Sequence, residues 1–313
     1  MNWRVKASLQ KILSATRLGD QLNHIPATLK KEYHQNVVRY QFHECLRKYD
    51  YTNLDLNQPN YALEIGTGYS IISPIILTLL GFKKVVTVDI DKDITFKTFQ
   101  KQINFLNQSE FIDNISQRSV FSAKEIKNKL DFIVGCTSLE EALSFSNIIY
   151  VAPYTIEDIE DEEITFDYIY SQVVFEHIPP KFLEVLFEKF RSWLKKGGFT
   201  VHTINFVDHF TNPGFFQDKK ISEYNFLRFS DKQWKFWAGN SIAYTNRLSY
   251  IYYHELFKKN DLIILDFIGE NYKPSISLAL DQVHEDIIKK YKVSPDLTKL
   301  TKYQRGTFIA QNI

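Results

Sequence analysis

A chain of 313 residues with 44% hydrophobic side chains can bury a sizeable core, which excludes wholesale disorder. Its 38 basic and 37 acidic side chains leave a formal net charge of +1, so no global field attracts nucleic acid or an anionic membrane. No apolar run is long enough to span a bilayer. The two cysteines, Cys45 and Cys136, form no metal-binding pair. We therefore expect a cytoplasmic protein with no nucleic-acid partner and no stable membrane insertion.

The first part of the chain is predicted to be helical. Apolar residues such as Val5 and Leu9 recur at helix-like spacing, which predicts an N-terminal helical extension over residues 1–58. A turn-forming segment around Pro59 then breaks this pattern. We therefore expect a separate domain over residues 59–313.

Strands and helices alternate along the rest of the chain. Strands are expected at 61–65, 85–89, 147–151, 166–171, 199–206, 262–268 and 304–311. Helices are expected at 71–80, 92–107, 180–195, 249–260 and 281–291, with insertions at about 108–146 and 207–247. Because Gly197-Gly198 is a conventional helix end, the helix at 180–195 is expected to stop there. Strict alternation predicts an α/β domain whose mainly parallel sheet is covered by helices on both faces.

The segment "LEIGTGYS" (63–70) places two glycines directly after the first expected strand. Gly66 and Gly68 allow a tight turn and the close approach of a ligand at the carboxyl end of the sheet. A dinucleotide-binding turn would carry a third glycine at position 71, where Ile71 stands. The charge of Glu64 suits a cationic ligand better than a pyrophosphate. The turn is therefore predicted to bind a cationic ligand.

A second carboxylate stands at the end of the next expected strand. Asp89 can accept hydrogen bonds from both hydroxyls of a ribose. The two carboxylates, Glu64 and Asp89, together predict a ligand that has a ribose and a positive charge but no phosphate. S-adenosyl-L-methionine fits this description.

Four segments resemble, in order, the motifs of class I S-adenosylmethionine-dependent methyltransferases over about residues 60–270. They are "LEIGTGYS" (63–70), "VVTVDID" (85–91), "FDYIYSQVVFEHIPP" (166–180) and "FRSWLKKGGFTVHTI" (190–204). One departure is Ser70, where many members have a third glycine. The resemblance implies a Rossmann-like, doubly wound, seven-stranded sheet with N-terminal helices and a lid insertion after the fifth strand. It implies S-adenosyl-L-methionine as cofactor, bound by Glu64, Gly66, Thr67, Gly68, Tyr69, Asp89, Ile90, Tyr154, Ser171 and Gln172.

Methyl transfer to a hydroxyl oxygen requires a proton acceptor, whereas an amine needs little beyond positioning. Histidine can act as a base near neutral pH, and a carboxylate can orient it. We predict His209 as the catalytic base, His177 as the second candidate and Asp208 as a partner, provided that the backbone at 208–209 forms a loop. No established metal-ligand spacing is present, so no metal site is predicted.

Three downstream segments resemble a bacterial subgroup of the same family, in which they belong to the insertion after the fifth strand. They are "VHTINFVDHF" (201–210), "YNFLRFSDKQW" (224–234) and "NRLSY" (246–250). The resemblance implies substrate-side roles for Asn225, Arg228, Trp234, Asn246 and Arg247, and O-methylation of a small polar or glycan acceptor. Two alternatives stay open: an NAD(P)-dependent oxidoreductase on a doubly wound fold, and a non-catalytic, methyltransferase-like binding protein.

Overall fold

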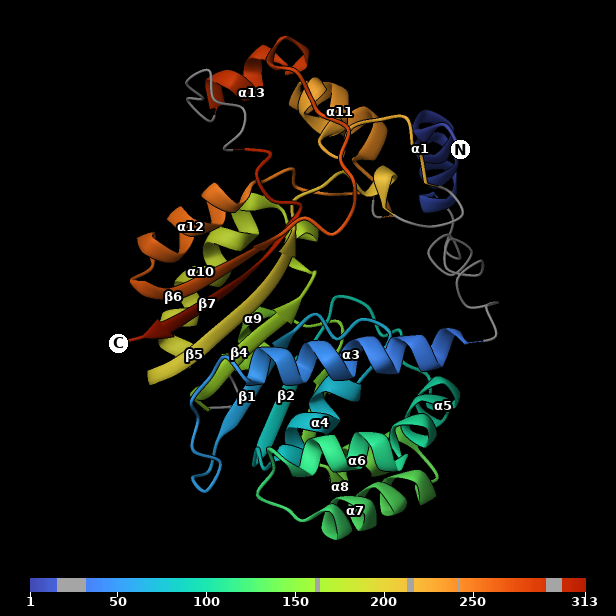
Figure 1. Ribbon diagram of the computed structural model, residues 1–313, viewed down its shortest axis with the longest axis vertical. Helices are drawn as coiled ribbons and strands as arrows, with labels where there is room; N and C mark the ends of the chain where they lie inside the picture. The colour runs from blue at the N-terminus through green and yellow to red at the C-terminus, as the bar shows by residue number, and fades with distance from the viewer. Residues whose placement is uncertain (16–31, 161–163, 213–216, 241, 291–299) are drawn as a thin grey trace. The chain divides into compact units, whose positions relative to one another are not determined.

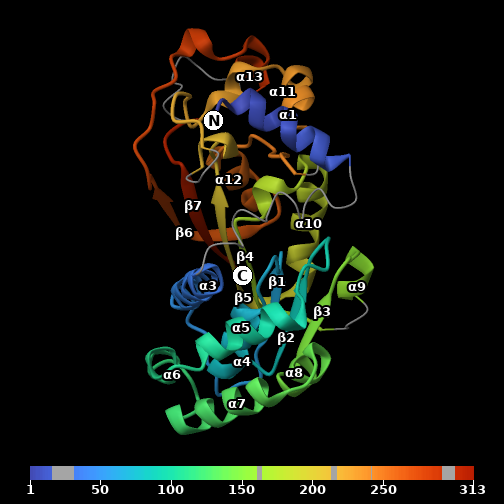
Figure 2. The same ribbon diagram turned by 90° about the vertical axis from the view of Figure 1, so that its right-hand side faces the viewer.

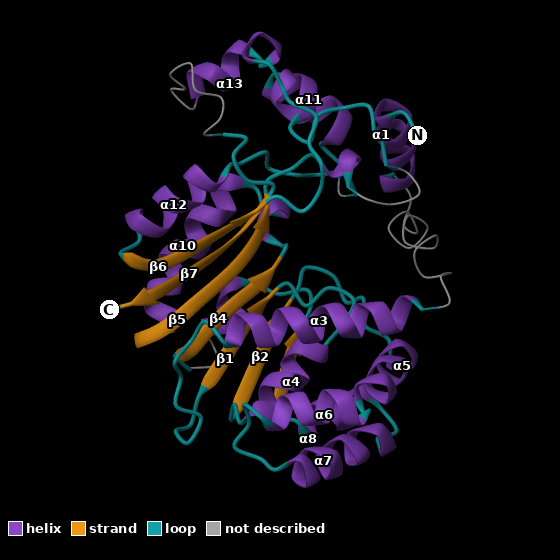
Figure 3. Cartoon of the chain, viewed as in Figure 1, coloured by secondary structure: helices purple, strands orange, loops and turns teal. Residues whose placement is uncertain are grey.

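The computed structural model describes residues 1–15, 32–160, 164–212, 217–240, 242–290 and 300–313 (Figure 1). Within these residues seven strands form one sheet, in the order β3-β2-β1-β4-β5-β7-β6. The strands are β1 (Tyr61–Ile65), β2 (Lys84–Val88), β3 (Ile148–Val151), β4 (Phe166–Gln172), β5 (Leu194–Asn205), β6 (Leu262–Glu270) and β7 (Arg305–Asn312). β1 pairs in parallel with both β2 and β4, and β2 pairs in parallel with β3. The predicted seven-stranded α/β sheet is therefore confirmed (Figure 3).

Helices connect and flank these strands. They are α1 (Trp3–Ser14), α3 (Tyr33–Tyr49), α4 (Ile72–Leu80), α5 (Phe96–Leu106), α6 (Ser109–Ser116), α7 (Ala123–Gly135), α8 (Leu139–Phe145), α9 (Ile156–Glu160), α10 (Pro180–Trp193), α11 (Asp231–Ala238), α12 (Tyr250–Lys259) and α13 (Glu285–Lys290). Several begin at a capping side chain: Ser122 and Ser230 each form a reciprocal capping box at the start of α7 and α11. Among the described helices, none is long and apolar enough to cross a membrane.

The Gly197-Gly198 pair does not end a helix, contrary to the expectation from sequence. α10 ends at Trp193 and β5 begins at Leu194, so both glycines lie inside the strand. Side chains of β7 explain the early start, because the Asn312 amide donates to the Leu194 carbonyl at 2.9 Å and the Gln311 amide donates to the Gly197 carbonyl at 2.8 Å. Gly197 has a φ of +80°, a conformation that favours glycine over residues with a side chain.

The chain divides into two compact units. The motif unit comprises residues 30–172, 188–202 and 309–313, and the insertion unit comprises residues 1–29, 173–187 and 203–308. In the motif unit, α4 is buried along nearly its whole length, and α3 packs against α4 and α5. The motif unit therefore holds β1 to β4 and the segment "LEIGTGYS", and the insertion unit holds the segments that follow β5.

An aromatic cluster forms the core of the insertion unit. The Trp3 ring of α1 has its centroid 5.6 Å from Phe210, 5.9 Å from Trp234 and 5.4 Å from Trp237. The Trp3 backbone also donates a hydrogen bond to the Asp218 carboxylate at 2.9 Å. Figure 2 shows the result, with α1 lying beside α11. The first helix is thus part of this core.

We expect Trp3→Ala to lower the free energy of unfolding by about 3 kcal/mol, because truncating a buried aromatic ring leaves a cavity. Trp3 is only 5% exposed, whereas Val5 on the same helix is 52% exposed. Val5→Ala is therefore the matched control and should change stability little. Denaturant unfolding followed by circular dichroism measures both, and equal stability of the two variants would contradict the packing described.

Candidate functional site

The glycine turn after β1 is tied to the end of β2. The backbone N–H groups of Gly66 and Thr67 donate to the Val88 carbonyl at 2.8 and 3.2 Å. Gly66 and Gly68 have φ values of +86° and +59°, which L side chains rarely adopt. A Cβ built on Gly68 would meet nothing within 4 Å, so there is space beside this backbone. The turn therefore leaves room for a ligand to approach closely.

Asp89 lies beside this turn. One carboxylate oxygen accepts a hydrogen bond from the Gly68 N–H at 2.6 Å, and the other accepts one from the Ile90 N–H at 2.7 Å. The Tyr154 N–H donates to the Asp89 carbonyl at 3.1 Å. Asp89 is only half-buried and Ile90 is 71% exposed. The Asp91 N–H also reaches Oδ1 of Asp89, but only at 3.5 Å. Since a carboxylate offers about four lone pairs, Asp89 can accept hydrogen bonds from ribose hydroxyls if they displace this long contact.

Five of the residues predicted to bind the cofactor therefore lie close together at the ends of β1, β2 and β3. They are Gly66, Gly68, Asp89, Ile90 and Tyr154. Tyr69 follows the turn and is 37% exposed. This arrangement fits a nucleoside, because it combines fixed acceptors for hydroxyl groups with open, partly apolar surface.

Glu64 is buried in the motif unit and does not lie on an open surface. Its side chain accepts a hydrogen bond from the Thr87 hydroxyl at 2.6 Å, and the residue is 4% exposed. Burial raises the pKa of Glu64 to about 7, and the nearby Thr87, Tyr170 and Lys48 partly offset this effect. Contact of Glu64 with the cofactor stays a prediction. The hydroxyl of Thr67 lies 2.6 Å from that of Thr87, in the same polar cluster.

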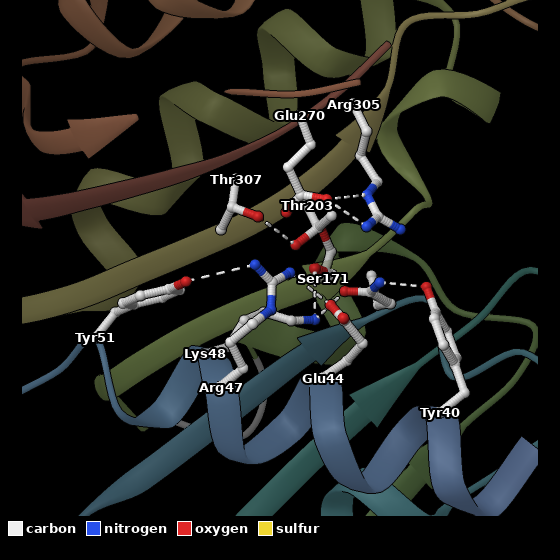
Figure 4. A network of polar contacts seen from close by, with 11 residues as sticks. Tyr40, Glu44, Arg47, Lys48, Tyr51, Ser171, Thr203, Glu270, Arg305 and Thr307 are labelled. Atoms are coloured by element: carbon white, nitrogen blue, oxygen red, sulfur yellow. Dashed lines mark hydrogen bonds and ion pairs between the residues drawn. The ribbon is translucent and has the colours of Figure 1, made fainter. Parts of the chain in front are cut away.

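Lys48, which the sequence analysis did not identify, contacts two of the predicted cofactor-binding residues, Ser171 and Gln172. Its ammonium group donates to the Ser171 carbonyl at 3.2 Å and to the Gln172 side chain at the end of β4 (Figure 4). The Gln172 amide in turn bonds the Tyr40 hydroxyl. Burial lowers the pKa of Lys48 to about 8. Lys48 continues the helical spacing of Val38, Phe42 and Cys45, which are all buried, and this periodicity was the signal that could have found it.

The Ser171 side chain is already engaged inside the motif unit. Its hydroxyl lies 2.8 Å from Nδ1 of His202, and Nε2 of His202 bonds the Thr200 hydroxyl. The His202 ring stacks on Phe190 with centroids 5.3 Å apart. Burial lowers the pKa of His202 well below its ordinary value. This histidine is neutral and fully bonded, so we assign it to the core.

In the insertion unit, His177 and His209 lie next to each other and beside Glu176. The ring centroids of the two histidines are 4.9 Å apart, and one potential ligand atom from each of the three residues lies within 4.8 Å of the others. Burial lowers the pKa of His177, and burial together with the charge of His177 lowers the pKa of His209 to about 3. Burial raises the pKa of Glu176 to about 8. Both histidines are therefore neutral at pH 7.

Asp208 does not orient His209. The backbone at His209 forms the short helix η2 (His209–Thr211), as the prediction required, but Asp208 caps that helix by accepting from the Phe210 N–H at 2.8 Å. Its other oxygen accepts a hydrogen bond from the Asn225 amide at 3.1 Å. Burial raises the pKa of Asp208 to about 6. Its carboxylate thus supports the backbone that carries the histidine.

Most of the predicted substrate-side residues are buried and engaged in structural contacts. The Asn246 amide donates to the carbonyls of Phe175 and Ile178 at 2.6 and 2.9 Å. Arg247 donates to the carbonyls of Phe226 and Phe229 and pairs with Asp231. Trp234 belongs to the aromatic core, Asn225 bonds Asp208, and Arg228 is exposed. Their contact with a substrate stays a prediction.

We expect Glu64→Gln to change how stability depends on pH. A carboxyl group whose pKa is raised from 4.5 to about 7 in the folded protein contributes stability that is complete below pH 4.5 and is lost as the pH rises through 7. Glutamine carries no such penalty, so the variant should gain up to about 3 kcal/mol relative to the parent between pH 4.5 and 7.5. Denaturant unfolding across this range measures the difference. The exposed Glu140→Gln is the matched control, and equal pH profiles for both variants would refute the burial effect.

The chain is similar to known methyltransferases in sequence and in fold. Residues 37–262, more than half of the chain, match the family model described as a methyltransferase domain. No curated protein matches. The chain is similar to solved structures from three organisms. One is a Haloferax volcanii methyltransferase in complex with the Trm112 methyltransferase activator, at 11% identity over 90% of this chain and 94% of that chain, with a TM-score of 0.43.

The second is an S-adenosylmethionine-dependent methyltransferase of Listeria monocytogenes, at 13% identity over 87% of this chain and 97% of that chain, with a TM-score of 0.43. The third is geranyl diphosphate C-methyltransferase of Streptomyces coelicolor A3(2), at 12% identity over 91% and 85% of the two chains, with a TM-score of 0.42. The family match spans the glycine turn and Asp89. The chain therefore belongs to the methyltransferase-domain family and is an S-adenosyl-L-methionine-dependent methyltransferase.

Proposed function

We propose that the enzyme methylates a hydroxyl oxygen of a small polar or glycan acceptor, in the cytoplasm. The observation that carries this proposal is the pair of neutral histidines, His177 and His209, in the segments that follow β4 and β5. An amine acceptor needs no proton acceptor, whereas a hydroxyl does. A pair of neutral imidazoles is therefore better matched to oxygen than to nitrogen.

When bound, S-adenosyl-L-methionine supplies an electrophilic methyl group on a sulfonium centre. The residues around the glycine turn fit it, because Asp89 offers acceptors for the ribose hydroxyls and Gly68 leaves space for close approach. With the cofactor held there, the acceptor oxygen would take the methyl group and the sulfur would keep the bonding electron pair, so the part left to the enzyme is to position the acceptor and to receive its proton. The hydroxyl proton passes to an imidazole nitrogen of the enzyme.

The preference between the two histidines is opposite to the one predicted from sequence. A base whose pKa is about 3 holds a transferred proton poorly, and this is the value that burial imposes on His209. Burial also lowers the pKa of His177, but this side chain keeps solvent-accessible surface, so it can pass a proton on to water. We therefore propose His177 as the group that receives the proton, and His209 as its neutral neighbour.

Methyl transfer from isotope-labelled S-adenosyl-L-methionine to a panel of sugars, other polar alcohols and matched amines tests the proposal. Labelled product from hydroxyl compounds, with an NMR shift typical of a methyl ether, is the expected result. Transfer to the amines alone would refute O-methylation and leave the family assignment intact.

A further inference from the structure

We infer that Glu176, His177 and His209 form a binding site for one divalent transition-metal ion. The three residues come from two short helices, η1 (Phe175–His177) after β4 and η2 after β5, both in the insertion unit. A potential ligand atom from each lies within 4.8 Å of those of the other two. A tetrahedral ion with bonds of about 2.0–2.1 Å needs ligand atoms about 3.4 Å apart. Side-chain rotations that bring the ligand atoms closer together by up to about 1.4 Å close that difference.

Three buried polar atoms of this cluster, from Glu176 and His209, lack a hydrogen-bond partner of acceptable geometry. Glu176 is 3% exposed, and neither of its carboxylate oxygens makes a hydrogen bond of acceptable geometry, although Asn205 lies beside it. Nε2 of His209 is also buried and unpaired. Native proteins seldom leave three such atoms unsatisfied in one place, because each unpaired group keeps its desolvation cost. One cation would satisfy all three.

The hydrogen bond of His177 prepares its other nitrogen for coordination. Nδ1 lies 3.1 Å from the Tyr244 carbonyl, which can only accept, so Nδ1 carries the proton. Nε2 therefore presents a lone pair. A ligating histidine commonly donates its second N–H to a carbonyl in this way, which fixes both the tautomer and the ring orientation.

Both ligand-bearing turns are held in place by neighbouring groups. The Asn246 amide bonds the carbonyls that flank Glu176 and His177, and the Asn246 N–H donates to the Glu176 carbonyl at 2.8 Å. Asp208 caps the turn that carries His209. In this proposal Asn246 and Asp208 are positioning residues: their buried side chains hold the backbone of the two turns that carry the ligands.

Three cationic side chains act on the cluster, and each has an acidic partner: Arg305 acts on Glu176 and pairs with Glu270. Lys6 and Lys273 act electrostatically on His209, but the Asp208 carboxylate interacts with both and offsets them. Two imidazoles and one carboxylate suit Zn²⁺, Fe²⁺ or Co²⁺, whereas Mg²⁺ and Ca²⁺ prefer oxygen ligands alone. Three protein ligands leave a coordination position open for water or another oxygen ligand. If that oxygen belonged to the acceptor, Nε2 of His177 would be a metal ligand and could not receive the proton, so this use of the site is an alternative to the base role proposed for His177. The metal site itself does not rest on the proposed function.

Titration of the full-length, tag-free protein with Co²⁺ tests the site. We expect saturable visible absorption bands and, by mass spectrometry of the Zn²⁺-loaded protein, one ion per chain. Glu176→Gln and His177→Ala should each weaken binding by about 10-fold or more. His254→Ala is the matched control, since His254 is exposed on α12 with its ring nitrogen 4.0 Å from Glu255, and it should bind as the parent does.

Binding of S-adenosylhomocysteine by each variant shows that it is folded, and it reports on the cofactor site independently of the metal. Should Glu176→Gln fail to fold, His177→Ala provides the same test, because the His177 side chain is exposed. Absence of saturable Co²⁺ binding would overturn the proposal, as would binding that both variants retain. Neither result would touch the methyltransferase assignment.

Discussion

Asp89→Ala is expected to abolish binding of S-adenosylhomocysteine in isothermal titration calorimetry. The variant would lose the two charge-assisted hydrogen bonds that we predict to the ribose, each contributing about 1.5–3 kcal/mol, so the affinity should fall by about 10²–10⁴-fold. It also loses the acceptor that holds the Gly68 N–H at 2.6 Å, which loosens the glycine turn. Both effects weaken cofactor binding at the glycine turn.

The control for this prediction is Asp113→Ala. Asp113 is an exposed carboxylate on α6, in the same unit, so its removal changes the net charge by the same amount without touching the turn. Its affinity should match that of the parent. If Asp89→Ala still gives a full, saturable heat, Asp89 does not bind the ribose.

His209→Ala is expected to retain binding of S-adenosylhomocysteine and to lower turnover by less than the about 10²–10⁴-fold that a proton acceptor contributes, because His209 packs against the proposed acceptor His177 and does not itself receive the proton. The residue lies in the insertion unit, in contact with His177, whereas the residues around the glycine turn belong to the motif unit. Cofactor affinity and turnover should therefore separate. Calorimetry measures the first, and transfer of a labelled methyl group to the best acceptor of the panel measures the second.

His254→Ala is again the appropriate comparison, because it removes an exposed histidine from the same unit. It should leave turnover unchanged. Parent-like turnover in His209→Ala would remove His209 from the reaction, whether as a neighbour of the base or as a ligand. Loss of cofactor affinity in that variant would show instead that the two functions are not separable.

The strands and the glycine turn could be predicted from sequence because local signals specify them. The first expected strand matches β1 exactly at 61–65, and positive φ values occur at Gly66 and Gly68, where the motif requires them. Element ends were harder to predict. The helix expected from residue 92 begins at Phe96, after the Thr95 cap. The start of β5 depends on side chains of β7, more than 100 residues away in the chain.

Site residues were harder to predict where burial and contacts with residues distant in the sequence decide the protonation and the hydrogen bonds of a side chain. Nothing near Glu64 in the sequence shows that its carboxylate, on strand β1, interacts with Lys48 of helix α3. The sequence order Asp208-His209 suggested a catalytic pair, but the carboxylate is used by Phe210 and Asn225. Local sequence identifies which residue types are present, whereas tertiary packing decides what each of them faces.

Lys48 also bears on how the protein can be shortened. A fragment that starts at residue 59, where the strand pattern begins, would lack α3 and with it the ammonium group that bonds the Ser171 carbonyl. The Ser171 carbonyl and the Gln172 side chain would then lose this hydrogen-bond donor, and Glu64 would lose the cation that acts on it electrostatically. Such a fragment would keep every segment that resembles a family motif but would lose the contacts that α3 makes with the end of β4. Expression of the catalytic portion should therefore begin ahead of Tyr33.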